Sequence, residues 1–171
     1  EEMYAVALKQ RTTSNMTPDE IHNLGLELIN QLQSEMDTIL RAQGLTSGTV
    51  AQRVTQVSRR PDQLYPNNDA GRAQLLADLN AQVAAITVRM PEVCGVLARA
   101  PLEIKRVPVF TEAGSPGGYY QRASLDGSRP GAYYINLRDT SEWPKFSLPT
   151  LSYHEGVPGH HWQGSIQQEA G

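Results

Sequence analysis

A long stretch near the start of the chain, residues 17–43, has the clearest helical pattern in the sequence. Its large apolar residues recur at intervals of three and four, which places them on one face of a helix. They are Ile21, Leu24, Leu28, Leu32, Met36, Ile39 and Leu40. Thr17, Pro18 and Glu20 form a capping box with proline at the first helical position, and Gly44 supplies a stop. The pattern predicts a long amphipathic helix whose apolar stripe belongs to a core.

Two shorter patterns predict more helix in the first part of the chain. One covers about 47–58. The other starts at a cap formed by Asn68 or Asp69 and runs to about Met90. Pro91 marks its end, because proline cannot donate a helical hydrogen bond. The turn-rich stretch "RRPDQLYPNND" separates the two helices.

The character of the sequence changes after residue 100. "PLEIKRVPVF" reads as a strand, and Pro108 places it near a sheet edge. Two aromatic pieces, 118–122 and 132–137, are joined by a Gly/Ser/Asp-rich turn and resemble a hairpin with a long loop. A helix resumes at Leu148. The order predicts an α+β fold, mostly helical, with a small antiparallel sheet preceding the last helix.

Three segments follow from this order. Residues 1–100 form a helical segment, residues 101–146 a small β-sheet or hairpin region, and residues 147–171 a helix with a metal-binding motif. The chain begins in helix-like sequence without a start signal and ends just after its most distinctive motif. We therefore expect one incomplete domain of a larger protein.

Composition narrows the class of protein. Hydrophobic residues make up 39% and charged residues 19% of the 171 residues, which suits a globular chain. The net charge of −3 argues against a nucleic-acid partner. No apolar run approaches the roughly 18 residues that a membrane segment needs. The single cysteine, Cys94, excludes an internal disulfide framework.

The motif near the end of the chain is "YHEGVPGHHWQ", which begins at residue 153. A His-Glu pair is typical of zinc hydrolases, whose second histidine ligand follows the first by four residues on the same helical face. Here the histidines after His154 are His160 and His161. On an unbroken helix His160 lies on a different face, and His161 lies on the same face at a rise of about 10.5 Å. Neither spacing suits one ion.

Pro158 and Gly159 offer a way to bring the histidines together. Proline breaks the hydrogen-bond ladder of a helix, and glycine tolerates backbone angles that other residues avoid. A zinc pair therefore requires a distorted helix at this point, with Glu155 beside it as general base. In the alternative interpretation, His154 and Glu155 form a partly buried polar pair, and Pro158 simply ends a helix.

The motif has the form His-Glu-x-x-Pro-Gly-His-His-x-Gln. It resembles that of a mostly bacterial family catalogued as domain of unknown function 885, grouped with the gluzincin-type zinc metallopeptidases. The resemblance extends along nearly the whole chain. Four segments match the family in order, namely "MTPDEIHNLGL", "LARAPLEIKRVPVF", "GSPGGYYQRASLDGSRPGAYYINL" and "LSYHEGVPGHHWQ".

The resemblance implies a zinc cofactor and roles for the motif residues. His154 and a histidine after the Pro-Gly pair would be metal ligands, and Glu155 would be the catalytic acid/base. His160 is preferred over His161, because removing the Pro-Gly pair places it four residues after the first histidine. The third ligand is expected to be a glutamate on a later helix outside this chain, and Glu169 is not taken as that ligand. Family members are generally longer, largely helical, and often exported or lipid-anchored in bacteria.

In zinc peptidases of this kind, a peptide substrate pairs with the edge strand beside the metal helix. "GAYYINL" is the expected edge strand, with Tyr134 and Asn136 as substrate-binding residues on one face. The simpler interpretation is that Tyr119, Tyr120, Tyr133 and Tyr134 only pack the sheet against the helices.

The leading hypothesis is a fragment of a zinc-dependent hydrolase that cleaves peptide or amide bonds. Its expected partners are a peptide or amide substrate and the rest of the parent polypeptide. The fragment alone is expected to be inactive, because it lacks the third ligand. One alternative is a catalytically silent peptide-binding domain that keeps the fold. Another is a metal-independent hydrolase that uses Glu155 with a second carboxylate.

Overall fold

The computed structural model describes residues 2–170 and divides the chain into two compact units, residues 1–57 and residues 58–171. The boundary falls within residues 1–100, which the sequence predicts as a single helical segment. None of the helices within residues 2–170 combines the length and the apolar character needed to cross a membrane.

The first unit consists of helices. They are α1 (Glu2–Thr12), α2 (Pro18–Ala42) and α3 (Val50–Ser58). The predicted capping box begins α2, because the Thr17 hydroxyl accepts from the Glu20 N–H and the Glu20 carboxylate accepts from the Thr17 N–H. Gly44 follows the helix in the left-handed conformation, with φ +79°. Buried Arg53 of α3 pairs with Asp37 of α2 and joins the two helices.

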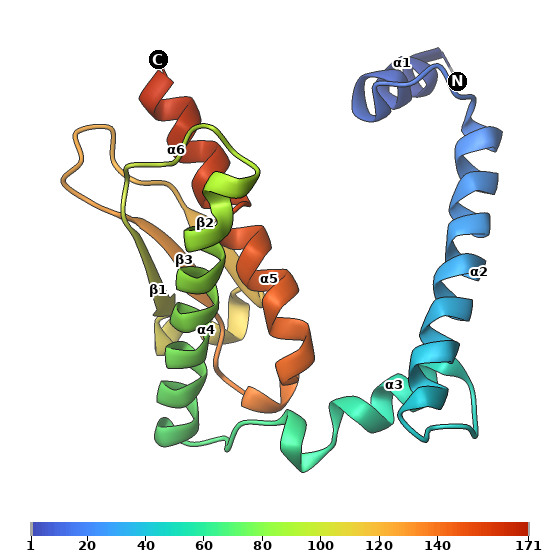
Figure 1. The fold of residues 1–171 in the computed structure, drawn as a ribbon. Helices are drawn as coiled ribbons and strands as arrows, with labels where there is room; N and C mark the ends of the chain where they lie inside the picture. The colour runs from blue at the N-terminus through green and yellow to red at the C-terminus, as the bar shows by residue number, and fades with distance from the viewer. Residues whose placement is uncertain (1, 171) are drawn as a thin grey trace. The chain divides into compact units, whose positions relative to one another are not determined.

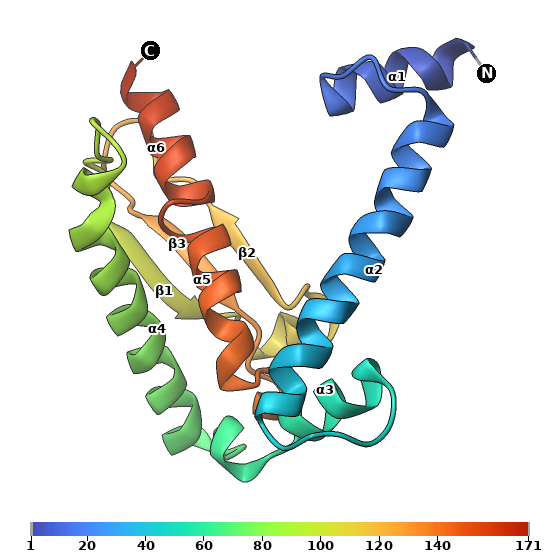
Figure 2. The ribbon, with the colours of Figure 1, turned by 45° about the vertical axis from the view of Figure 1, so that its right-hand side comes forward.

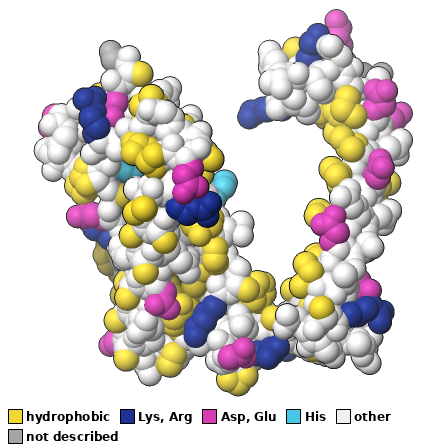
Figure 3. Space-filling model, viewed as in Figure 1, with side chains coloured by type: hydrophobic (Ala, Val, Ile, Leu, Met, Phe, Trp, Pro, Cys, Tyr) yellow, Lys and Arg dark blue, Asp and Glu magenta, His cyan; other side chains and the backbone are white. Residues whose placement is uncertain are grey.

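The apolar stripe of α2 is exposed, so the prediction that it belongs to a core is wrong for this chain. Leu40 is buried, whereas Leu32 and Ile39 remain 55% and 62% exposed. Figure 3 shows hydrophobic side chains at the surface of this helix. The physical reason is that α1 and α3 cover little of the stripe within the first unit.

The second unit packs helices on a small sheet. Its main elements are α4 (Asp69–Arg89), β1 (Leu102–Arg106), β2 (Gly118–Gln121), β3 (Gly131–Ile135), α5 (Leu148–Glu155) and α6 (His160–Ala170). The Asn68 side chain caps α4 by accepting from the Gly71 N–H, as predicted. Helices α4, α5 and α6 cover one face of the sheet, and α6 continues beyond the end of α5 after a break (Figures 1 and 2). The α+β fold with a small sheet before the motif is thus confirmed.

The sheet has the order β1-β3-β2. β2 and β3 form the predicted antiparallel hairpin, but β1 pairs with β3 in parallel, so the sheet is mixed rather than wholly antiparallel. β1 is an edge strand, as expected. The prediction that "GAYYINL" is an edge strand is wrong, because its β3 portion is paired on both sides. The edge strand on the side of α5 and α6 is β2.

Two clusters of buried side chains hold this unit together. The larger one joins Leu75 and Leu79 of α4 to Tyr133 and Ile135 of β3 and to Leu148 of α5. The smaller one includes Val83, Met90 and Val157. Because Val157 lies between α5 and α6, its burial ties the break between these helices to the core.

Candidate metal centre

The backbone between α5 and α6 makes a turn that is two residues wider than a helical turn. The Gly159 N–H donates to the Tyr153 carbonyl at 2.9 Å, a separation of six residues instead of the helical four. The Trp162 N–H spans the same separation to Gly156. Pro158 lies inside this turn and has no N–H to donate. The helix is therefore distorted at the place where a zinc pair would require it.

Only glycine fits at position 159 of this turn without a shift of the backbone. A Cβ atom at this position would lie 1.8 Å from the His154 carbonyl oxygen. Contacts of a Cβ below 3.0 Å essentially never occur, so a larger residue would force the backbone apart. The close approach brings the start of α6 back against the end of α5.

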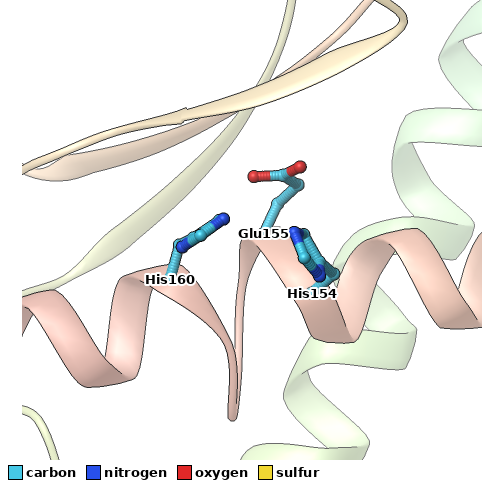
Figure 4. A group of neighbouring side chains, drawn as sticks. All are labelled: His154, Glu155 and His160. Carbon is cyan, nitrogen blue, oxygen red and sulfur yellow. The ribbon is translucent and has the colours of Figure 1, made fainter. Parts of the chain in front are cut away.

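As a result, His154 and His160 face each other across the break. Their ring centroids are 4.6 Å apart and their rings are nearly perpendicular. Figure 4 shows the two imidazoles and the Glu155 carboxylate directed toward a common space. One potential ligand atom from each of the three residues lies within 4.8 Å of the others. Glu155 is 6% exposed, whereas both histidines are exposed.

The imidazoles of His154 and His160 form no hydrogen bond within residues 2–170, which leaves their nitrogens free for a ligand. Neutral imidazole and carboxylate groups are the ligands that hydrolytic zinc sites use. The donor set of the described residues thus fits zinc, with two histidines and one carboxylate in reach.

His161 lies outside this group, although the sequence includes it among the candidate metal ligands. Its Nε2 is 3.1 Å from the Ala100 carbonyl oxygen, which can only accept, so Nε2 carries the proton. Its Nδ1 therefore accepts from the Tyr120 hydroxyl at 3.0 Å. Both ring nitrogens are occupied, and burial lowers the pKa of His161, which favours this neutral form. The structure gives His161 a part in packing α6 against β2.

The Tyr120 hydroxyl is suited to this role as donor. Burial raises the pKa of Tyr120, so the hydroxyl keeps its proton. Gly131 of the neighbouring strand leaves room for the contact, because a Cβ there would lie 2.4 Å from the Tyr120 oxygen and 2.7 Å from His161 Nδ1. This network joins α6 to β2 and to the segment at Ala100.

A pocket of about 400 Å³ opens beside the three converging residues. It is lined by Gly118, Tyr119, Tyr120, Arg122, Glu155, His160 and Gln163. Strand β2 therefore forms one wall, and the start of α6 forms another. Sequence reasoning missed Arg122 and Gln163 as lining residues. The period of two along 118–122, which places Gly118, Tyr120 and Arg122 on one face, could have indicated the first of them.

The residues predicted to bind substrate lie elsewhere. Asn136 is buried, and its side-chain amide donates to the Glu112 carbonyl at 2.7 Å. Tyr134 stacks on Tyr119 of the neighbouring strand, with ring centroids 5.0 Å apart. Neither residue lines the pocket. Glu169 accepts from the backbone N–H of Arg99 and pairs with its side chain, so it is also engaged elsewhere.

Fold and site together define an α+β protein with a paired-histidine and glutamate cluster at a broken helix. The family model described as "Bacterial protein of unknown function (DUF885)" matches residues 1–171. The chain belongs to this family.

A solved structure is also similar to this chain. The "putative lipoprotein" from Colwellia psychrerythraea is 41% identical and superposes with a TM-score of 0.91 over 98% of this chain. The match covers 28% of that protein, so the present chain spans less than a third of its length. No curated protein matches the sequence.

Proposed function

We propose that this chain carries the metal-binding motif of a zinc-dependent, metallopeptidase-like hydrolase that cleaves peptide or amide bonds. One observation carries the proposal, namely the convergence of His154 and His160 beside the buried carboxylate of Glu155. The same three residues occupy the positions of ligand, base and ligand in the gluzincin-like motif. The adjoining pocket supports the proposal, because Glu155 and His160 both line it.

In this proposal His154 and His160 hold the ion through their free imidazole nitrogens. A zinc ion supplies Lewis-acid activation of water and of the substrate carbonyl group. Glu155 takes the proton from the attacking water and transfers it to the departing amine. Glu155 follows His154 in the chain and its carboxylate lines the pocket. This position suits a group that takes a proton from the water and gives it to the departing amine.

The proposal places the third protein ligand outside this chain. Hydrolytic zinc sites take three protein ligands. Within residues 2–170, the cluster contains only Glu155 besides the two histidines, and the proposed reaction needs that carboxylate as base. We infer that a glutamate on a later helix completes the site in a longer parent protein. The size of the solved relative supports this inference, since this chain corresponds to 28% of it.

We also propose an exported or lipid-anchored location in bacteria. The support is the description of the solved relative as a putative lipoprotein. Detection of the natural protein in the membrane or periplasmic fraction, with fatty-acid labelling, tests this point. A protein found only in the cytoplasm contradicts it.

Glu155→Gln in the protein at its full natural length tests the reaction. With fluorogenic peptides as substrates, we expect hydrolysis to fall by a factor of about 10²–10⁴, the range for loss of a general acid/base. Bound zinc should remain stoichiometric, because the glutamine leaves both histidines in place. Glu142→Gln is the matched control, since Glu142 is exposed and pairs with Arg138 away from the pocket.

The outcomes separate the competing functions. Full activity of Glu155→Gln eliminates the proposed mechanism. Stoichiometric zinc without hydrolysis of any peptide, together with measurable peptide binding, favours a catalytically silent binding domain. Hydrolysis that survives complete removal of zinc favours a metal-independent enzyme.

A further inference from the structure

Arg122 is the guanidinium group of the pocket that contains Glu155 and His160. We propose that Arg122 binds a carboxylate group of the substrate. The inference rests on the proposed hydrolase function and adds the chemical class of the group that the pocket recognises beside the reacting bond.

Arg122 directly follows β2 and lies farther along α6 than the cluster of His154, Glu155 and His160. Gly118 lies against Leu151 of α5, and a Cβ there would be 3.2 Å from that side chain. Tyr120 contacts His161 of α6. Arg122 then lies over Gly164, whose added Cβ would be 3.6 Å from the guanidinium Nε.

Gly118 and Tyr120 of β2, and Arg122 directly after the strand, thus follow α5 and α6 in order. Because Gly164 is one helical turn after His160, the guanidinium group lies one turn past the second metal ligand. Arg122 and Glu155 line the same pocket. A ligand bound to Arg122 therefore lies within the pocket that Glu155 and His160 also line.

Arg122 has unused hydrogen-bonding capacity. Its side chain makes one long contact, 3.4 Å from Nη2 to the Gln167 side-chain oxygen, and it is exposed. A guanidinium group carries five N–H donors. No carboxylate within residues 2–170 forms an ion pair with Arg122. Six other arginines of the second unit do have carboxylate partners, namely Arg60, Arg72, Arg89, Arg99, Arg106 and Arg138.

The chemistry of the pocket favours a carboxylate ligand at this position. The planar fork of arginine matches a carboxylate with two parallel hydrogen bonds. Two sources supply such a group, the C-terminus of a peptide and the side chain of an aspartate or glutamate.

Peptide binding to the full-length protein tests the inference. One fluorescent peptide sequence is prepared with a free C-terminal carboxylate, with a C-terminal amide, and as the amide with an added glutamate. Affinities are measured by fluorescence anisotropy in a Glu155→Gln background, in which cleavage is suppressed. Arg122→Gln is compared with Arg59→Gln, which removes the same charge from an exposed position outside the pocket.

We expect Arg122→Gln to weaken binding of a carboxylate peptide about fivefold and of the amide less than twofold. Fivefold corresponds to about 1 kcal/mol, the upper range for an exposed ion pair. Arg122→Lys should retain part of the preference, and Arg59→Gln all of it. Whichever carboxylate peptide loses affinity identifies the source of the group. Attraction of carboxylates to bound metal is common to the variants and cancels in the ratio.

The inference is overturned if Arg122→Gln weakens the binding of all three peptides equally or of none. It is also overturned if the protein with Arg122 in place shows no preference for the carboxylate peptides. A failure of the proposed function gives a different set of results. If the wild-type protein shows no zinc-dependent hydrolysis but Arg122→Gln removes the carboxylate preference, the binding site stands and the hydrolase proposal falls. If zinc-dependent hydrolysis is found but Arg122→Gln leaves the carboxylate preference unchanged, the hydrolase proposal stands and the binding site falls.

Discussion

Replacing Gly159 by alanine tests the broken turn that creates the metal centre. The new Cβ would lie 1.8 Å from the His154 carbonyl oxygen, so the backbone must separate by more than about 1 Å to reach a tolerable contact. We set the cost of keeping the converged geometry at about 3 kcal/mol, the upper end of the usual overpacking range. Because each 1.4 kcal/mol is a factor of ten, zinc affinity should fall by about a hundredfold.

Zinc affinity is measured on the full-length protein by competition with a chromophoric chelator. Gly164→Ala is the control on the same helix, since its Cβ would meet ordinary contacts of 3.6 Å and more. That change should leave zinc binding nearly unaltered and should raise helix stability by about 0.5–1 kcal/mol. A Gly159→Ala variant that binds zinc as tightly as the wild type would refute the reasoning.

Two further substitutions test buried contacts of the second unit. Arg106 pairs with buried Glu112 and holds the pKa of that carboxyl below its ordinary value. The ion pair therefore stabilises the folded state fully above the unfolded pKa of about 4.3, and this contribution is lost as the pH falls through the folded pKa. Glu112→Gln should therefore cost about 1–3 kcal/mol in urea unfolding at pH 7 and flatten the loss of stability in acid; an unchanged acid limb contradicts this. Gly131→Ala should displace Tyr120 from His161 and lower the free energy of unfolding by about 1–3 kcal/mol. Nitrogen NMR should then show that His161 no longer holds a single tautomer. An unchanged spectrum would reject the network.

Features determined by neighbouring residues were predictable from the sequence. The capping box of α2 and the Asn68 cap of α4 depend on side chains within three residues of the helix start. The break at Pro158 and Gly159 is equally local, because it follows from a missing N–H and a residue without a side chain. The convergence of His154 and His160 then follows from the number of residues in the widened turn.

Features determined by distant partners were not predictable. The spacing of the motif does not show that the side chains of His160 and His161 have different surroundings. The Ala100 carbonyl and the Tyr120 hydroxyl occupy the ring of His161, and they lie 61 and 41 residues away in the chain. The order of the sheet has the same origin, because β3 inserts between β1 and β2 through pairing over long separations. The apolar stripe of α2 was identified correctly as a pattern, but pattern alone does not specify what covers it.

The most direct test of the account is an anomalous-scattering map at the zinc edge, from crystals of the full-length protein grown with zinc. The account predicts one ion bonded to His154 and His160, with the Glu155 carboxylate beside it and His161 still bonded to Tyr120 and Ala100. Crystals in which the two imidazoles point apart, with no ion between them at saturating zinc, would contradict it.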